Sequence, residues 1–570
     1  MRTPTSPQTT KTRIRRVSAI GSALIVGIAA SLAMGQPAYA ATVTVDTTDD
    51  TVAPDGATSL REAIDLANAA GSDTTIELQA GATYELDLCG GATEDANASG
   101  DLDYTAGDAL TINGNGAVIE QTCSGERVFH NTDGTATVTL VNLTLTGGEG
   151  QGAAVSYAGD LVLNGVTVMD NDAGASAVLD SEPGITGASL TLTGSTVGPN
   201  VGNGIRISFG SVTISGSTIT QNTERGVGLV DGALSIADSV FENNGSDGAR
   251  TTGQGSGLLT FTNSIARHNG GVGLVCSNCG DVQISDSKIH DNDGGGIAVA
   301  TDQDEATDDL TISVARTSVN DNSSAGSGAG LVVTTTELTD DAPLAQVLID
   351  SSTFARNSAG GSGGAIHVQN GELRIDNSTV VENSAATSGG GVATENHDIH
   401  VRHATITDNK APSGANIASG ADLYAFASIV AAAAGGGGDC AIAGATTSTG
   451  FNIGGDATCA FAGTADVNSA GDPGLGPLQD NGGATLTRQP LAASVAVGKV
   501  PATACTVLTV DQRGVTRPQG TACEAGSVEI GEGGNGLPPT GVSVTWIMVA
   551  GAILLIVGAG VLLLIRRRAS

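Results

Sequence analysis

The sequence predicts an all-β fold in which short strands stack, coil upon coil, into a solenoid, and three repeating features predict it. Residues 212–222 and 373–383 share one order of alternating apolar residues, a serine and an asparagine. Such an asparagine recurs at intervals of 22 to 35 residues. A Gly-rich turn and usually a second apolar pair follow it, as at 204–207, 294–299 and 364–368. Each unit therefore holds two or three strands of period two, and none has the pattern of a helix.

These units predict stacking, because one unit alone cannot bury its apolar face. Coils stacked at the strand spacing of about 4.8 Å bury one continuous apolar column and satisfy each other's backbone. Over residues 110–470 the pattern resembles the right-handed parallel β-helix, the architecture of pectate-lyase-like proteins. In that architecture aligned asparagines form a ladder inside one turn. The resemblance implies a structural ladder at Asn171, Asn200, Asn222, Asn244, Asn269, Asn292, Asn322, Asn357, Asn383 and Asn409. A parallel serine row is expected at Ser195, Ser217, Ser239, Ser264, Ser287, Ser352 and Ser378.

The repeated asparagines also admit a functional interpretation, as the ligands of a binding site. Ten regularly spaced copies favour architecture, because a site needs one constellation and not ten. We therefore assign them no catalytic or metal-binding role.

The first forty residues have the order of a signal peptide. A basic stretch at 11–16 precedes an apolar run at 19–33, and small residues end the segment at 38–40. A membrane anchor is the alternative, but fifteen residues are short for a hydrocarbon core of about 30 Å. We expect 1–40 to be a signal peptide, with cleavage after Ala40 and export of the rest.

Residues 41–109 are expected to form an N-terminal cap, because an open solenoid end exposes unpaired strand edges. The run Ser-Leu-Arg-Glu at 59–62 predicts a capping box at a helix start. Apolar residues follow at positions i, i+3, i+4 and i+7 from Leu60, so we expect a short capping helix with one apolar face.

The segment 58–68 resembles the Cys-Ser-Leu-Arg-Glu-Ala-Ile start of a family of bacterial surface β-helix proteins, with Thr58 in place of the usual cysteine. The family's disulfide at that position is accordingly absent. Residues 511–518 and 523–529 look like the closing module of the same proteins, which implies a C-terminal module at 471–530. Most members have no assigned activity, so the resemblance implies architecture and display rather than chemistry.

Two charged pairs stand inside these cap motifs, Arg61 with Glu62 and Arg513 with Asp511. Such neighbours also suit catalysis, but their place in the caps favours structural ion pairs.

The C-terminal end predicts attachment to a cell wall. A Gly-rich tether at 531–536 leads to the motif Leu537-Pro538-Pro539-Thr540-Gly541, an uncharged stretch at 542–565 and a basic tail at 566–570. The stretch is long enough to span a bilayer, and the arginines after it are expected on the cytoplasmic side. The three parts in this order resemble the sorting signals of Gram-positive surface proteins. That resemblance implies that a sortase cysteine attacks the carbonyl of Thr540 and that the acyl group passes to an amine of the peptidoglycan precursor. An ordinary single-span anchor is the alternative.

Charge and composition exclude some partners. Residues 41–540 carry all 59 acidic residues but only 16 of the 24 basic ones, a formal net charge of −43. Such a surface repels nucleic acid and anionic lipid, so no nucleic acid partner is expected. Aromatic residues make up 2% of the chain, which leaves few stacking platforms for sugars or bases.

All eight cysteines follow the signal segment, in a compartment where disulfides persist. They fall in sequential twos, which favours neighbour pairing among the 105 connectivities that eight cysteines allow. The expected pairs are Cys89–Cys123, Cys276–Cys279, Cys440–Cys459 and Cys505–Cys523. The run at 276–279 also suits half of a zinc site or a redox pair, but no second such run exists and His268 and His290 are isolated. We expect a small loop staple there.

Many β-helices cleave acidic polysaccharides, so an enzyme is the alternative function. The run Asn-Thr-Asp-Gly at 131–134 matches one polygalacturonase motif, but the later Gly-His-Gly and Arg-Ile-Lys motifs of that family are missing. Carboxylates suited to a lyase or to calcium lie in two long insertions, at Asp302, Asp304, Glu305, Asp308 and Asp309 and at Glu337, Asp340 and Asp341. A solvated acidic loop is the commoner form of such a sequence. His397, His400 and His403 are expected to form a surface group, with metal binding as the lesser alternative.

We therefore expect a secreted β-helix, anchored to peptidoglycan by a sortase after its C-terminal segment has passed transiently through the membrane. Its expected role is display or adhesion toward host or environmental glycans or proteins. A wall-anchored polysaccharide lyase or glycoside hydrolase is the alternative. No catalytic residue, metal site or cofactor is assigned, and calcium is the alternative cofactor.

Overall fold

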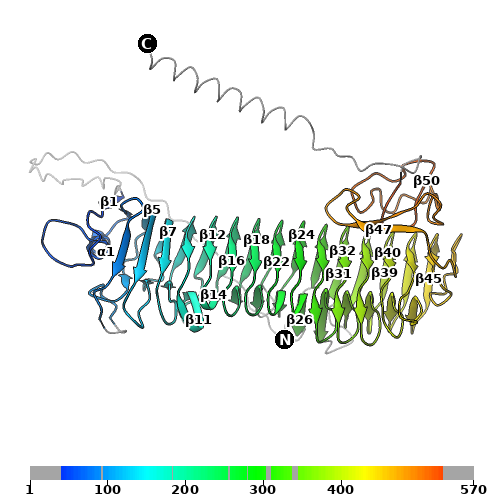
Figure 1. The fold of residues 1–570 in the computed structure, drawn as a ribbon, viewed down its shortest axis with the longest axis horizontal. Coiled ribbons are helices and arrows are strands. Elements are labelled where there is room, and N and C mark those ends of the chain that lie inside the picture. The colour runs from blue at the N-terminus through cyan, green and yellow to red at the C-terminus, as the bar shows by residue number, and fades with distance from the viewer. Residues whose placement is uncertain are drawn as a thin grey trace, which may run out of the picture. The chain divides into compact units, whose positions relative to one another are not determined.

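The computed structural model describes residues 40–90, 94–182, 184–253, 257–278, 280–302, 310–336 and 345–530. Within these ranges the chain is a parallel β-solenoid with one helix, so the predicted all-β fold class is confirmed (Figure 1). No helix of the described ranges is long and apolar enough to cross a membrane. The signal segment 1–39 and the tether, sorting motif, apolar stretch and basic tail at 531–570 lie outside them.

Each full coil contributes three strands, and each strand pairs in parallel with its equivalent in the next coil. The first and second strands share a 29-stranded sheet. The chain bends between them at a residue with a positive φ, such as Gly194, Gly216 or Asn263. The first strands are β1 (Ala41–Thr44), β2 (Thr74–Glu77), β5 (Leu110–Gln121), β7 (Thr137–Thr146), β9 (Asp160–Asn164), β12 (Ser189–Thr193), β15 (Ser211–Ser215), β18 (Ala233–Ala237), β21 (Leu259–Thr262), β24 (Val282–Ser285), β27 (Thr311–Ala315), β31 (Ala345–Asp350), β35 (Gly371–Asp376), β39 (Ile399–Arg402), β42 (Leu423–Phe426) and β45 (Thr446–Gly450). Since β1 pairs with β2 and β2 with β5, parallel pairing begins at Ala41, inside the segment expected to be a cap.

The second strands follow the first along the chain after the bend, and β5 and β7 are long enough to extend through both positions. The others are β3 (Thr83–Leu86), β10 (Thr167–Val168), β13 (Thr196–Val197), β16 (Thr218–Thr220), β19 (Val240–Glu242), β22 (Ile265–Arg267), β25 (Lys288–His290), β28 (Ser318–Asn320), β32 (Thr353–Ala355), β36 (Thr379–Val381), β40 (Thr405–Thr407), β43 (Ile429–Ala431) and β46 (Ile453–Gly454).

The third strands form a separate 14-stranded sheet. It consists of β4 (Leu102–Tyr104), β6 (Phe129–Asn131), β8 (Val155–Tyr157), β11 (Asp172–Ser181), β14 (Val201–Ser208), β17 (Val227–Val230), β20 (Ala249–Thr252), β23 (Val272–Ser277), β26 (Gly295–Asp302), β30 (Leu331–Thr336), β34 (Ile366–Val368), β38 (Val392–Thr394), β41 (Ile417–Ser419) and β44 (Cys440–Ile442). Three short strands, β29 (Ser323–Ser324), β33 (Ser358–Ala359) and β37 (Ser384–Ala385), pair in the turns of later coils.

The core is a stack of like residues, because parallel register places equivalent side chains above one another. Ile214, Ile236 and Phe261 follow in register along the first strands, and each is at most 1% exposed. Side chains between them point outward, so period-two sequence becomes one apolar column inside the solenoid.

Glycine precedes the third strand for a steric reason. A Cβ added at Gly226, Gly248 or Gly273 would lie 2.5 to 2.8 Å from a carbonyl oxygen of the next coil. It would also lie 3.0 to 3.1 Å from the Nδ2 of a ladder asparagine. Adjacent coils approach too closely for any side chain at these positions.

The helix α1 (Leu60–Ala70) packs against β1, β2 and β4 at the N-terminal end (Figure 1). The Ser59 hydroxyl accepts a hydrogen bond from the Glu62 backbone at 3.1 Å, and the Glu62 carboxylate accepts one from the Ser59 backbone at 3.0 Å. This is the predicted capping box. The predicted apolar face is buried at Leu60, Ala63, Ile64 and Ala67.

Arg61 is fully buried, and its ion-pair partner is Asp50, not Glu62 as the sequence suggested. Its Nε lies 2.8 Å from Asp50 Oδ1, and its other nitrogens donate to the carbonyl oxygens of Gly100 and Asp101, both at 2.8 Å. Glu62 is already used by the capping box. The pair is structural, as expected, but it ties the helix to a residue eleven positions upstream.

Residues 471–530 fold back against the side of the later coils. They contain two antiparallel pairs, β47 (Leu475–Gln479) with β48 (Thr487–Pro490) and β49 (Val500–Pro501) with β50 (Ala522–Cys523). Gln512 donates to the carbonyl oxygen of Ser352 at 3.1 Å and accepts from the Thr379 hydroxyl at 2.6 Å. Ser527 donates from its backbone to the Thr405 hydroxyl at 3.0 Å. The module therefore covers the outward side of β32, β36 and β40.

Two ion pairs hold this module together. Arg513 Nη2 lies 2.8 Å from Asp511 Oδ2, the pair that the sequence predicted. Arg517 and Glu529 form a second pair whose side chains are both 0% exposed.

Three of the expected disulfides are confirmed, Cys89–Cys123, Cys440–Cys459 and Cys505–Cys523. Cys276 is also disulfide-bonded, and Cys279 lies outside the described residues.

Candidate functional site

The ten ladder asparagines occupy one turn of successive coils, and each is at most 4% exposed. Each Nδ2 donates to the Oδ1 of the next asparagine at 2.9 to 3.2 Å. Each Nδ2 also donates to a backbone carbonyl of an earlier coil, as Asn292 does to Ala266 at 3.1 Å. Asn416 and Asp439 end the series, with Asn409 Nδ2 to Asn416 Oδ1 at 3.0 Å and Asn416 Nδ2 to Asp439 Oδ1 at 2.9 Å. These amides bond one coil to the next and present no open face to a ligand.

The serine row accepts backbone hydrogen bonds from coil to coil. The Ser195 backbone donates to the Ser217 hydroxyl at 3.1 Å, and the same contact repeats along the row. Thr317 fills the place between Ser287 and Ser352, which sequence inspection for serine missed. A threonine hydroxyl accepts the same hydrogen bond, so residue identity alone undercounts this row.

The residues predicted for attachment and for acid chemistry mostly lie outside the described residues. They are the sorting motif at 537–541 and the carboxylates at 304, 305, 308, 309, 337, 340 and 341. The backbone of Asp302 ends β26, but its side chain belongs to the same undescribed set.

The three histidines at 397, 400 and 403 do not form the surface group expected of them. His400 lies on the outer face, stacked on Tyr424 with ring centroids 4.6 Å apart, and 3.2 Å from Glu372. His403 is fully buried, and neither of its ring nitrogens has a hydrogen-bond partner. Burial and then the nearby Arg517 hold the pKa of His403 well below its usual value. His403 has a positive φ, but so do Asn263 and Arg316 at the same bend of earlier coils, and both are exposed. His403 is buried because the C-terminal module covers it, with Glu524 and Gly526 close to its ring.

The structure does bring together a polar column on the outward face of the 14-stranded sheet. In register, strand by strand, it consists of Asp103, His130, Ser156, Asp180 and Arg206. The neighbours of these residues along each strand point into the core, since Leu102, Phe129 and Val155 are at most 1% exposed. Successive members stand 24 to 27 residues apart in the sequence, which is the coil period. That period was the available signal, but a search for one recurring residue type does not find it, because the residue type changes at every coil.

His130 lies between carboxylates at both ring nitrogens. Its Nδ1 is 3.1 Å from Asp103 Oδ1 and 3.4 Å from Asp95 Oδ1, and its Nε2 is 2.8 Å from Glu182 Oε1. The Ser156 hydroxyl donates to the same Glu182 oxygen at 3.1 Å. Asp103 is 0% exposed and His130 5%, so the centre of this cluster is closed to large molecules.

The electrostatics of this cluster are dominated by burial. Burial lowers the pKa of His130, but hydrogen bonds that the imidazole donates to Asp103 and Glu182 oppose it and the net shift is upward. Burial, with repulsion from Asp103, raises the pKa of Asp101 to about 7. The three carboxylates around the imidazole outnumber the nearby positive charge of Arg127, so an excess of negative charge is left that a cation can neutralise.

Farther along the same sheet the column becomes a set of paired charges. Arg206 Nε and Nη2 donate to Asp180 at 3.0 and 2.5 Å. Arg225 and Arg250 both contact Asp247, at 3.3 and 2.7 Å. Each of these arginines contacts a carboxylate, with Arg225 and Arg250 sharing Asp247, which suits cross-coil stabilisation.

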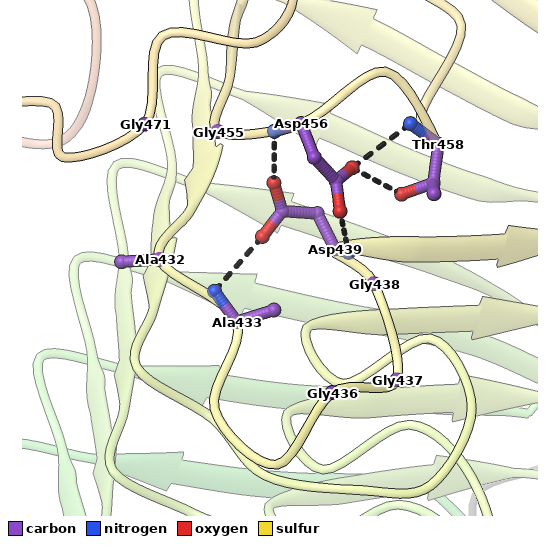
Figure 2. A pocket seen from close by; sticks show the side chains of 10 residues that line it. All are labelled: Ala432, Ala433, Gly436, Gly437, Gly438, Asp439, Gly455, Asp456, Thr458 and Gly471. Atoms are coloured by element: carbon purple, nitrogen blue, oxygen red, sulfur yellow. Dashed lines mark hydrogen bonds between the residues drawn. The ribbon is translucent and has the colours of Figure 1, made fainter.

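An open cavity of about 580 Å³ lies near the C-terminal end of the solenoid, between the glycine-rich turn at 436–438 and Gly471 (Figure 2). The two carboxylates that line it, those of Asp439 and Asp456, accept hydrogen bonds from neighbouring residues. Asp439 accepts from the amides of Ala433 and Asp456 at 3.0 and 2.7 Å, while Asp456 accepts from Thr458 and from the Asp439 amide at 3.0 Å (Figure 2). These contacts stabilise the turn that ends the Asn ladder. Both carboxylates are therefore used in structural hydrogen bonds.

The fold defines a class, the parallel β-helix proteins. Residues 97–233 and 185–313 match, as two overlapping segments, the family model of the right handed beta helix region, and the predicted right-handed β-helix is confirmed. No curated protein matches the chain.

Three solved structures are similar at low identity. The Azotobacter vinelandii mannuronan C-5 epimerase AlgE4 A-module is 15% identical over 72% of this chain and 95% of its own, with a TM-score of 0.31. The AlgE6 A-module of the same organism is 13% identical over 72% and 93%, with a TM-score of 0.29. Pectate lyase Pel9A is 12% identical over 86% and 96%, with a TM-score of 0.27. Likeness at this level carries no argument about activity.

Proposed function

We propose that this protein is secreted, is anchored to the cell wall by a sortase acting at Thr540, and displays its β-helix for adhesion. The sorting motif at 537–541, the uncharged stretch after it and the basic tail support the anchoring. Three disulfides among the described residues support an oxidising, extracytoplasmic location.

The observation that carries the adhesive role is an uncharged face on an acidic chain. Along eight consecutive first strands, from β7 to β27, two outward residues per strand are neutral, although the chain has a formal net charge of −35. We call these residues the neutral face. They are Thr139, Val141, Val162, Asn164, Thr191, Thr193, Thr213, Ser215, Ser235, Ala237, Thr260, Thr262, Gln283, Ser285, Ser313 and Ala315. Hydroxyl and methyl groups repeat there at about 4.8 Å from strand to strand, which suits contact with an extended neutral surface.

The enzymatic alternative has its most suitable described residues at His130, Asp103 and Glu182. A polysaccharide needs an open groove, whereas Asp103 and His130 are covered. Incubation with acidic polysaccharides should therefore release neither reducing ends nor unsaturated products. Turnover that is lost on substitution of His130, or of Asp302, Asp304 and Asp308, would overturn the adhesive proposal.

The anchoring is tested by scrambling residues 537–541 while leaving 542–570 intact. A membrane protein does not depend on the pentapeptide, but a sortase substrate does. The scrambled protein should move from the muramidase-released wall fraction to the membrane fraction or the medium. Identical fractionation of both proteins would show that 542–565 is an ordinary membrane anchor.

The adhesive face is tested by introducing charge where the backbone tolerates it. Thr213 and Ser235 are exposed neighbours on adjacent strands, so Thr213→Lys with Ser235→Lys should reduce attachment of expressing cells to glycan-coated and protein-coated surfaces. Val230→Lys, on the 14-stranded sheet and also exposed, is the matched control. If the native protein, the double lysine variant and Val230→Lys attach equally, the neutral face has no role in adhesion.

A further inference from the structure

The donors around His130 have the spacing of ligands about one metal ion. His130 Nδ1, Asp103 Oδ1 and Asp95 Oδ1 all lie within 4.8 Å of one another, with the imidazole 3.1 and 3.4 Å from the two carboxylates. Ligands held at about 2.0 to 2.2 Å from a tetrahedral ion are themselves about 3.3 to 3.6 Å apart. A small contraction around an ion would therefore complete the geometry without moving a strand.

Two of the three donors are already held in place by other contacts. Asp103 Oδ2 accepts a hydrogen bond from the backbone N–H of Asn97 at 3.1 Å. In return, the side-chain Oδ1 of Asn97 accepts one from the backbone N–H of Asp103 at 3.1 Å. Asn97 Nδ2 in turn donates to the Arg61 carbonyl oxygen at 2.8 Å, so the capping helix supports Asp103. A fixed, buried carboxylate loses little freedom when it binds an ion.

The second nitrogen of His130 has the partner that metal-binding histidines usually have. Its Nε2 lies 2.8 Å from Glu182 Oε1, and a carboxylate in this position fixes the tautomer and the ring plane. This contact is independent of the three donors and leaves Nδ1 directed at Asp103 and Asp95.

Access and charge also fit a small cation. The Asp95 side chain is 63% exposed while Asp103 is 0% exposed, so the cluster opens to solvent on one side. The disulfide Cys89–Cys123 anchors the segment that carries Asp95 to the chain that follows β5. The strongly acidic surface raises the local concentration of cations.

We propose that Asp95, Asp103 and His130 form a binding site for a divalent transition-metal ion of the zinc class. One imidazole nitrogen and two carboxylate oxygens are ligands that zinc accepts, with a further position left for water. Calcium takes six to eight oxygen ligands and is a poorer match. The site is a feature of the N-terminal end and does not depend on how the chain is anchored.

The test is a titration of the metal-free full-length protein with Zn²⁺ by calorimetry, in excess Ca²⁺ to occupy weak acidic sites. One tight equivalent is expected. Asp95→Asn should weaken it at least tenfold, and because Asp95 is exposed this variant should fold normally by circular dichroism. Glu182→Gln should weaken it about 10- to 100-fold through its contact with His130.

The matched control is His290→Asn. His290 Nδ1 lies 2.7 Å from Asp291 Oδ2, so it belongs to a histidine–carboxylate pair outside the His130 cluster, and its loss should leave the tight equivalent unchanged. Co²⁺ in place of Zn²⁺ should give visible absorption bands that Asp95→Asn changes. The proposal is overturned if no tight equivalent is found, or if Asp95→Asn and Glu182→Gln bind Zn²⁺ as the unmodified protein does.

Discussion

Replacing Asn292 with alanine should remove one step of the Asn ladder and open the solenoid locally. In the native protein Asn292 Nδ2 donates to Ala266 O at 3.1 Å and to Asn322 Oδ1 at 2.9 Å. Its Oδ1 accepts from the backbone and side chain of Asn269 at 3.2 and 2.9 Å. Asn292 is 1% exposed, so water cannot replace these partners without entering the turn.

The magnitude follows from the groups left without partners. The alanine variant orphans the backbone amide of Asn269, whereas Ala266 O loses one donor but stays in the parallel ladder of β22 with β25. Asn322 Oδ1 keeps the amide of residue 292, and Asn269 Nδ2 keeps Phe241 O. Each buried unsatisfied group costs about 1 to 3 kcal/mol. The expected loss of unfolding free energy is therefore about 1 to 3 kcal/mol.

The measurement is guanidinium unfolding followed by circular dichroism, with hydrogen exchange to locate the effect. Gln283→Ala is the matched control, because Gln283 also carries an amide, lies in the same coil and is exposed. Its effect should stay within about 0.5 kcal/mol. Amide protection should fall around Asn269 in the Asn292 variant alone. Equal losses in both variants, or unchanged protection at Asn269, would refute the structural role of the ladder.

Three further substitutions probe the cap, the coil contact and the buried histidine. Arg61→Leu strands the buried carboxylate of Asp50 and should cost about 3 to 5 kcal/mol in denaturant unfolding, part of which Asp50→Leu in the same chain should restore. Gly296→Ala places a Cβ 2.7 Å from a carbonyl oxygen of the next coil and should lower the melting temperature, whereas Gly228→Ala, with 3.9 Å to its nearest neighbour, should not. Burial depresses the pKa of His403, so the unfolded chain protonates first as pH falls below about 6.5 and stability is lost by about 1 kcal/mol per pH unit from there toward the folded pKa. Unfolding at about pH 7.5 and about pH 5.5 should show this loss in the native protein and a smaller one in His403→Phe, and equal losses would contradict it.

Repetition is why so much of the fold could be predicted from the sequence. In parallel register, residues one coil apart in the sequence lie above one another, so ten asparagines at the coil period are predicted to stack. The capping helix could be predicted equally well, because its capping box depends on residues only three positions apart. Arg61 shows the limit of such local signals. Its neighbour Glu62 is committed to the helix start, and its true partner, Asp50, is brought near only by the path of the chain over the first coil.

The unpredicted features arise where the repeat changes. His403 lies at the same bend as the exposed residues Asn263 and Arg316, yet it is buried because the C-terminal module covers it. The covering of β32, β36 and β40 by residues 471–530 depends on contacts more than a hundred residues apart, such as Thr379 with Gln512. No local pattern encodes such contacts.

The two polar columns of this solenoid suggest how architecture and site differ within one repeat. In the turn, one residue type recurs coil after coil, and each copy is satisfied by the next, so the column bonds to itself. On the outward face of the 14-stranded sheet the type changes at every coil, from Asp103 to His130 to Ser156. Unlike neighbours bond from coil to coil where their charges are opposite, as Asp180 does with Arg206. Around the imidazole, carboxylates gather instead, with Glu182 and Asp95 reaching in from adjoining loops. The feature that distinguishes a binding constellation is therefore the convergence of an imidazole and several carboxylates on one point, and that convergence directs the metal titration to the N-terminal end.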